Sequence, residues 1–145
     1  MDSPLLQPAE RPHGIPDPYL AYVDGLRAPE TQRAMRAALD AIVGLVLEEQ
    51  IGPAAFEAHE RVTGEGRTWW LLRAGDAKRI RELACAPRPA PPGVPQQAPV
   101  AGSVNKKLSA LRGVLEMCWR LGLMSGDDYL WAVEELKTVP VSGGQ

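Results

Sequence analysis

Apolar residues recur along this chain at intervals of three and four, which is the period of an amphipathic helix rather than of a strand. The clearest example runs from Ser103 to Met124. Its apolar face carries Val104, Leu108, Leu111, Leu115 and Cys118. Its opposite face is small and basic and carries Lys106, Ser109, Ala110, Gly113 and Arg120. Because small residues between cations would let a phosphate backbone approach, this face is a candidate nucleic-acid surface, with an ordinary core helix as the alternative.

Helix start and stop signals divide the rest of the chain. Asp17 is placed as an N-cap with Pro18 at the first helical position, so a short helix should end near residues 25–28. A second long helix is predicted over residues 30–49. Three further helices are predicted. Residues 75–85 form one that is capped by Asp76. The central helix is capped by Ser103 and ends at Gly122, and a last helix begins at Ser125.

No alternation of apolar and polar residues competes with these helices, so the sequence predicts an all-α fold: a compact orthogonal bundle of four to five helices. The bundle occupies residues 17–138. The Pro-rich residues 1–16 predict a disordered or extended arm, and residues 139–145 a tail. Residues 86–102 predict a stiff Pro-rich surface loop, with a polyproline ligand for an SH3-like domain as the alternative. Residues 54–68 fit either a helical turn or a loop.

The net charge of −2 hides an uneven distribution. Residues 1–66 hold five basic and eleven acidic residues, whereas residues 67–120 hold ten basic and three acidic. Such polarity predicts one positive surface, which would attract an anionic polymer. The exposed N-terminal half of the second helix carries Gln32, Arg33 and Arg36, where cations oppose the helix dipole. This misfit suggests a partner outside the helix, with simple surface charge as the alternative.

Several other functions are disfavoured by the sequence. The first residues lack a basic segment followed by an apolar run, and no apolar stretch approaches the ~20 residues that span a bilayer. Cys85 and Cys118 give neither a disulfide framework nor a zinc spacing, and neither His13 nor His59 has companions at metal-ligand spacing. We therefore expect a cytoplasmic protein with reduced thiols, without a metal or another cofactor.

Three stretches, in the same order, carry a resemblance to a known family. Asn105-Lys-Lys-Leu-Ser-Ala-Leu-Arg-Gly-Val-Leu followed by Trp119-Arg-Leu-Gly-Leu-Met resembles the last long helix of the N-terminal core-binding domain of tyrosine recombinases, the phage-integrase type. Tyr19-Leu-Ala-Tyr with Pro29-Glu-Thr31 is similar to the opening of that domain. Trp70-x-Leu-Arg73 leading to Ile80-Arg-x-Leu83 resembles its middle helix. Together these stretches span most of residues 18–139.

This resemblance implies a small SAM-like helical domain that clamps one face of double-stranded DNA, while the first and last helices contact other protomers of the recombinase. The groove-facing residues carried over from the family are Thr31, Gln32, Arg33, Arg36, Asn105, Lys106, Ser109 and Arg112. Lys106, Lys107 and Arg73 would contact phosphates, which gives affinity and salt dependence. Asn105, Arg112 and Gln32 would be the better candidates for base edges.

The family's catalytic residues (two Arg, a Lys, His residues and a nucleophilic Tyr) would lie in a domain beyond Gln145. None of Tyr19, Tyr22 or Tyr129 stands in that catalytic motif, so we expect this chain to bind DNA without cleaving it. The alternative is a helical protein-interaction module that modulates a recombinase or another partner without binding DNA.

Overall fold

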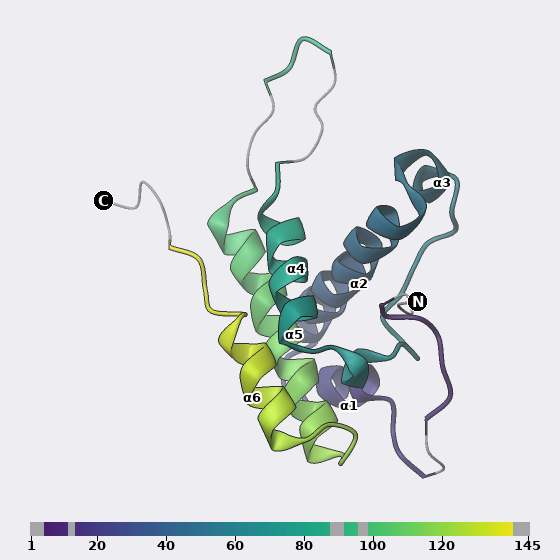
Figure 1. Ribbon diagram of the computed structural model, residues 1–145, viewed down its shortest axis with the longest axis vertical. Coiled ribbons are helices and arrows are strands. Elements are labelled where there is room, and N and C mark those ends of the chain that lie inside the picture. The colour runs from purple at the N-terminus through teal and green to yellow at the C-terminus, as the bar shows by residue number, and fades with distance from the viewer. Residues whose placement is uncertain (1–4, 12–13, 88–91, 96–98, 141–145) are drawn as a thin grey trace.

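The computed structural model describes residues 5–11, 14–87, 92–95 and 99–140. These residues form helices α1 (Pro18–Asp24), α2 (Pro29–Ile51), α3 (Pro53–Glu57), α4 (Ala74–Cys85), α5 (Ala101–Arg120) and α6 (Gly126–Glu134), with a 3₁₀ turn, η1 (Trp69–Leu71). Helix α5 runs through the middle of the bundle and contacts α1, α2, α4, α6 and η1 (Figure 1). The predicted all-α compact bundle is therefore confirmed.

Helix α5 buries the apolar face that the sequence predicts, since Leu108, Leu111, Leu115 and Cys118 are fully inaccessible to solvent. Its start differs from the prediction. The carbonyl of Val100 already accepts hydrogen bonds from the amides of residues 103 and 104, at 3.0 and 3.1 Å, so the first turn closes earlier. Ser103 consequently lies inside the helix rather than at its cap.

The end of α5 follows the prediction more closely. Gly122 adopts a left-handed conformation with φ of 77°. Its amide donates to the carbonyl of Trp119 at 3.0 Å, and the amide of Leu123 donates to the carbonyl of Cys118 at 2.9 Å. This pair of bonds is a Schellman motif, which ends the helix and redirects the chain. Ser125 then caps α6 by accepting a hydrogen bond from the amide of residue 128 at 3.1 Å.

The start of α1 also matches its sequence signal. The buried carboxylate of Asp17 accepts a hydrogen bond from the amide of Tyr19 at 3.2 Å, and Pro18 occupies the first turn. The second carboxylate oxygen accepts from the amide of Gly66 at 2.8 Å. One side chain thus caps α1 and fastens the loop that follows α3 to the body of the protein.

Residues 54–68, which the sequence leaves open, divide into α3 and a loop held by buried groups. Asp40 of α2 accepts hydrogen bonds from the hydroxyl of Tyr19 and the amide of Gly64, both at 2.8 Å. The indole of Trp69 donates to the carbonyl of Gly64 at 2.9 Å. A Cβ at Gly64 would lie 2.7 Å from the Tyr19 ring and 2.9 Å from that of Trp69, so this close packing requires glycine.

The N-terminal segment is attached to the bundle. Leu6 is buried at 2 % exposure, and the carbonyl of Gln7 accepts from the amide of Thr68 at 3.1 Å. Residues 5–11 are thus packed against the bundle, with a turn at Leu5 and Leu6 and an isolated β-bridge between Pro8 and Arg67. Residues 1–4 and 12–13 lie outside the described part of the chain.

Residues 92–95, within the Pro-rich loop, lie away from the helices (Figure 1). Residues 92–95 are exposed, whereas the predictions for residues 88–91 and 96–98 lie outside the described residues. The same holds for residues 141–145 of the predicted tail. No helix in the described ranges combines the length and the apolar character needed to cross a membrane.

Candidate nucleic-acid interface

A shallow hollow of about 240 Å³ lies between the first half of α2 and the start of α5. Its lining consists of Ala34, Ala37, Ala38, Ala41, Ser103, Lys106 and Lys107. Because the α2 wall is made of alanine, a polymer backbone can approach the two lysines closely. The two lysines are among the DNA contacts predicted from the sequence, whereas the alanines are not, although their spacing of three and four places them on one side of the helix.

The two lysines differ in how tightly they are held. Lys106 is exposed, and no carboxylate pairs with it among the residues that the structure describes. Lys107 is half-buried, and its Nζ donates to the Oγ of Ser103 at 3.1 Å. A hydroxyl orients an ammonium group without neutralising it, so both charges remain available to an anion.

Thr31 and Arg33 lie on α2 before the alanines of this hollow and do not line it. Thr31 is three residues before Ala34, and Arg33 is four residues before Ala37, so each shares a side of α2 with a lining residue. Both side chains are exposed. No ion pair engages Arg33 within the described ranges. Of the residues predicted to contact DNA, the structure places Lys106 and Lys107 in the hollow itself, and Thr31 and Arg33 one helical turn before its first alanines.

Arg36 lies on a different flank of α2. Its guanidinium carbon sits over the ring of Tyr19, 5.5 Å from the ring centroid, in a cation–π arrangement. Successive helix positions turn by ~100°, so Arg36 points toward α1 whereas Ala37 lines the hollow. Arg36 therefore does not join the cluster around the lysines.

Gln32 serves the connection between α1 and α2. Its amide nitrogen donates to the carbonyl of Leu26 at 2.8 Å, and the side chain is half-buried. Adenine recognition by an amide uses the nitrogen and the oxygen together. That pairing requires Gln32 to release Leu26, so the predicted base contact competes with a bond inside the protein.

Asn105 and Arg112 fasten the segment that follows α6. The amide of Asn105 donates to the carbonyl of Val139 at 3.1 Å and accepts from the amide of Val139 at 2.7 Å. Arg112 donates through Nη1 to the carbonyl of Leu136. Both side chains are half-buried. The two main candidates for base recognition on α5 are thus used to hold the returning chain.

The predicted small outer face of the central helix does not face outward. Ala110 has no exposed surface, and Ser109 is half-buried. A Cβ built on Gly113 would overlap the ring of Tyr22. The reason is that α1 packs against this side of α5, so Gly113 admits an aromatic ring of the protein itself and not a phosphate.

Arg73 lies among contacts made by η1, α4 and α6. Its Nη1 donates to the carbonyls of Trp70 and Leu72 at 2.9 and 3.0 Å, and its Nε lies 3.4 Å from a carboxylate oxygen of Asp128. Asp76 accepts from the backbone amide of Arg73 at 2.9 Å. The predicted phosphate contact is therefore surrounded by partners within the fold and stands apart from the hollow.

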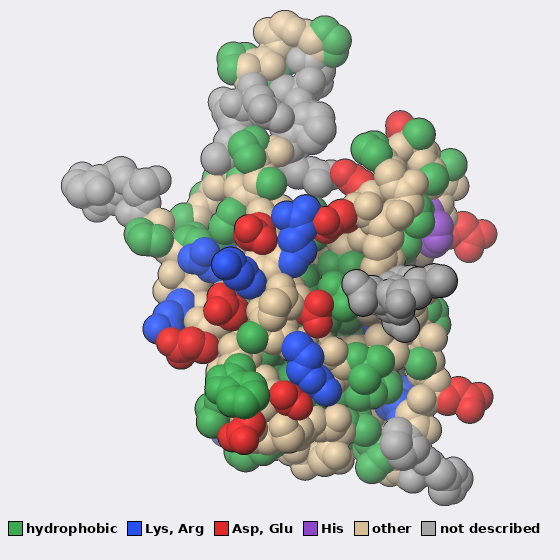
Figure 2. All heavy atoms as spheres, in the orientation of Figure 1, with side chains coloured by type: hydrophobic (Ala, Val, Ile, Leu, Met, Phe, Trp, Pro, Cys, Tyr) green, Lys and Arg blue, Asp and Glu red, His purple; other side chains and the backbone are tan. Residues whose placement is uncertain are grey.

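The face formed by α4 and α6 carries other cations beside carboxylates. Arg79 bonds Glu49 through Nη2 at 2.6 Å, and Lys137 lies 2.7 Å from Glu134. Figure 2 shows blue and red side chains interleaved over this face. Such pairs are exposed and contribute little to stability, but they reduce the positive potential that a phosphate would meet.

The three tyrosines all have structural neighbours. Burial, together with the hydrogen bond to Asp40, raises the pKa of Tyr19 to about 12. Burial raises the pKa of Tyr22 as well, and the pKa of Tyr129 is raised by burial and then by Glu116. The ring of Tyr129 also stacks on Trp119, with centroids 5.3 Å apart. A raised pKa disfavours the phenolate form of each of these side chains.

No metal centre is found in the described parts of the chain, where no three His, Cys, Asp or Glu side chains are grouped to hold an ion. Burial raises the pKa of the Cys118 thiol to about 12, which keeps it protonated and unreactive. Comparison with models of protein families, with curated proteins and with solved structures finds no match to this chain.

Proposed function

We propose that this chain is a DNA-binding module of the tyrosine-recombinase core-binding type, which holds duplex DNA without cleaving it. One observation carries the proposal. Lys106 and Lys107 line a hollow whose α2 wall is alanine, and neither has a carboxylate partner in the described residues. By contrast, Arg73, Arg79 and Lys137 on the α4–α6 face are paired.

The hollow would act mainly on the phosphate backbone. Each phosphate that a cation neutralises releases condensed counterions, so affinity falls steeply as salt rises. These contacts orient the module on DNA and carry little sequence information. Because Asn105, Arg112 and Gln32 bond backbone carbonyls, base recognition would rest first on the exposed Thr31 and Arg33 of α2.

The absence of cleavage is part of the same proposal. Cleavage by a tyrosine recombinase requires an activated tyrosine, and the raised pKa values of Tyr19, Tyr22 and Tyr129 work against a phenolate at neutral pH. We therefore expect incubation of a supercoiled plasmid with this chain to leave the plasmid supercoiled. Nicked product that disappears in a variant of one tyrosine would overturn this part of the proposal.

The DNA proposal is tested by fluorescence anisotropy on a duplex of about 20 base pairs at several salt concentrations. Wild type should bind at least in the non-specific range, with Kd of about 10⁻⁴–10⁻⁶ M. The slope of log K against log salt is negative, and its magnitude should be smaller by about one to two in K106A/K107A. The matched control is R79A/K137A, which removes two paired cations and should leave the slope nearly unchanged. Equal losses in the two variants would contradict the proposed surface.

A protein-interaction module that modulates a recombinase is the second candidate, and one observation favours it. Near α6, Trp119, Leu130 and Trp131 remain 44 %, 59 % and 63 % exposed, which is unusual for large apolar side chains so close together in sequence and fold. Its test adds the chain to a recombination assay with a purified tyrosine recombinase. A rate change that L130S/W131S abolishes, without any DNA binding by this chain, would favour the second candidate.

A further inference from the structure

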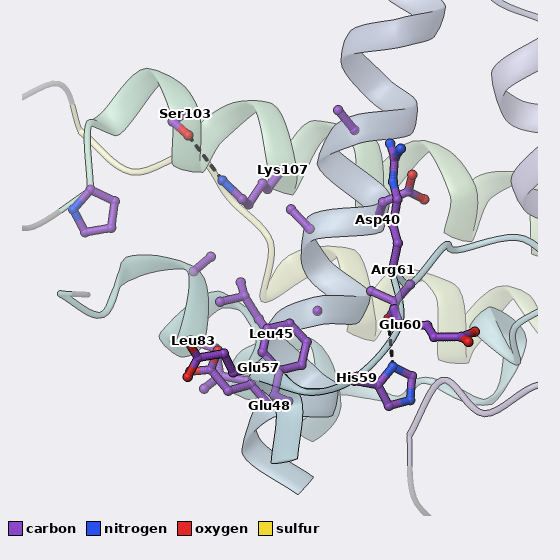
Figure 3. A pocket seen from close by; sticks show the side chains of 17 residues that line it. Asp40, Leu45, Glu48, Glu57, His59, Glu60, Arg61, Leu83, Ser103 and Lys107 are labelled. Carbon is purple, nitrogen blue, oxygen red and sulfur yellow. Dashed lines mark hydrogen bonds between the residues drawn. The ribbon is translucent and has the colours of Figure 1, made fainter. Parts of the chain in front are cut away.

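A larger pocket of about 810 Å³ adjoins the hollow and shares Ala37, Ala41, Ser103 and Lys107 with it. Its walls come from α2, from α3 and the loop after it, and from the facing ends of α4 and α5 (Figure 3). It differs from the hollow in size and in chemistry. The alanine wall of α2 continues into an apolar floor, and the charges around that floor are mostly negative.

The floor of this pocket is apolar and shallow along α2. Ala37 and Ala41 are exposed and present almost no side chain, while Leu45, Phe56 and Val62 supply larger apolar surfaces. Gly44 is buried beneath Phe56, since a Cβ there would lie 3.4 Å from the Phe56 ring. The two alanines therefore leave room for the backbone of another helix, and the larger side chains form the sides of a groove.

Carboxylates dominate the rim. Asp40, Glu48, Glu57 and Glu60 line the pocket, against the cations Arg61 and Lys107. Asp40 already accepts hydrogen bonds from Tyr19 and Gly64. Glu57 and Glu60 are exposed, and Lys107 is turned toward Ser103 at the opposite end of the pocket (Figure 3). A ligand on this floor would thus meet negative charge over α3 and the following loop.

We propose that this pocket binds a short amphipathic helix of a partner protein, with its apolar face on the floor and Lys or Arg along its flank. Charge complementarity selects a basic flank, because Glu57 and Glu60 border the apolar floor. The length of the α2 wall accommodates a short helix. From Ala37 to Glu48 the α2 wall is roughly 16 Å long at ~1.5 Å per residue, which is the length of about three helical turns.

This partner surface differs in charge from the proposed DNA contact and overlaps it at one edge. The carboxylates at the rim would repel a phosphate backbone, so the pocket and the hollow favour ligands of opposite charge. It is also separate from the exposed aromatic residues near α6, none of which lines the pocket. The two functions meet only at Ser103, Lys107 and the shared alanines.

The experiment titrates the full chain, labelled with ¹⁵N, with a 14-residue synthetic helix that has leucine on one face and lysine on both flanks. We expect saturable shifts of the backbone signals of Ala41, Gly44 and Phe56. A second peptide, with glutamate replacing every lysine, should bind at least 10-fold more weakly. A third peptide with the same composition in scrambled order, which has no apolar face, should not saturate.

Two variants locate the site. E57K/E60K reverses the exposed rim charges and should weaken the basic peptide at least 10-fold, and A41W should block the floor from a solvent-exposed helix position. K106A serves as the control, because it removes a charge outside the larger pocket and should leave peptide affinity unchanged. Circular dichroism checks that each variant is folded. Absence of saturable binding, equal binding of the acidic peptide, or unchanged affinity in folded A41W would each overturn the proposal.

Discussion

The two flanks of α5 carry similar polar residues, yet their surroundings differ completely. On the flank toward α2, Lys106 and Lys107 border an open hollow and have no carboxylate partner in the described chain. On the flank toward the end of the chain, Asn105 and Arg112 bond the backbone of Val139 and Leu136. Asn105 and Lys106 are neighbours in sequence, but only one of them remains open to a ligand.

This difference shows what determines which polar side chains of a central helix are available to a ligand. The segment after α6 returns along one flank of α5 and needs donors for its carbonyls, which Asn105 and Arg112 provide. The other flank faces the alanines of α2, which have no polar group to offer. Buried backbone carbonyls must be satisfied, so they capture the nearest polar side chains. The cations left over are the ones that an outside anion can reach.

Removing the Arg112 donor should produce the largest effect on stability. Arg112→Met keeps most of the side-chain volume but leaves the carbonyl of Leu136 without its charged donor, so the free energy of unfolding should fall by about 2 kcal/mol. Lys106→Met, a matched change on the open flank, should stay within about 0.5 kcal/mol of wild type. Urea denaturation measures both. If Lys106→Met proves the more damaging, the two flanks have been assigned the wrong way round.

A buried thiol on the apolar face of α5 should make the free energy of unfolding depend on pH, and substitutions on either flank should not alter that dependence. Burial raises the pKa of the Cys118 thiol from its ordinary value of 9.0, which we take for the unfolded chain, to about 12 in the fold. The unfolded state therefore loses its proton first, and the free energy of unfolding should fall as pH rises above about 9, by at most about 1.4 kcal/mol per pH unit. The raised pKa of Tyr19 adds a decline of the same sign above its ordinary value of 10.0.

Cys118→Ala tests this dependence through the slope rather than through the absolute stability. Between about pH 9 and about pH 10 the variant should be less sensitive to pH than wild type, because its thiol contribution is gone. Lys106→Met should keep the wild-type slope. An identical slope in Cys118→Ala and wild type would mean that the thiol is accessible to solvent or titrates normally.

Asn105→Ala should give a smaller and more local effect. It removes both hydrogen bonds to Val139, and we expect a loss of about 1 kcal/mol together with much faster hydrogen exchange at the Val139 amide. Backbone amides in the middle of α5 should remain protected from hydrogen exchange. Lys106→Ala is the control, with no change at Val139. Unchanged exchange at Val139 in the Asn105 variant would show that other contacts hold the returning segment.

The sequence predicted the fold more fully than the candidate site, for physical reasons. Apolar spacing identified the buried face of α5, and short-range signals placed Asp17, Ser125 and Gly122 at helix ends. These features depend on residues a few positions apart. Whether Asn105 meets solvent or Val139 depends on a segment 34 residues away, which local periodicity does not encode. For the same reason Gly113 gave no sign that Tyr22 covers it.

The DNA surface is tested most directly by comparing Lys106→Met with Arg112→Met, since both remove one charge from α5. Their salt dependence of duplex binding is measured by anisotropy at a temperature where both variants are folded. We expect Lys106→Met to reduce the magnitude of the negative slope of log K against log salt by about 0.9, and Arg112→Met to leave the slope unchanged. A less steep slope in Arg112→Met, with no change in Lys106→Met, would contradict the proposal that the hollow between α2 and α5 is the surface that meets DNA.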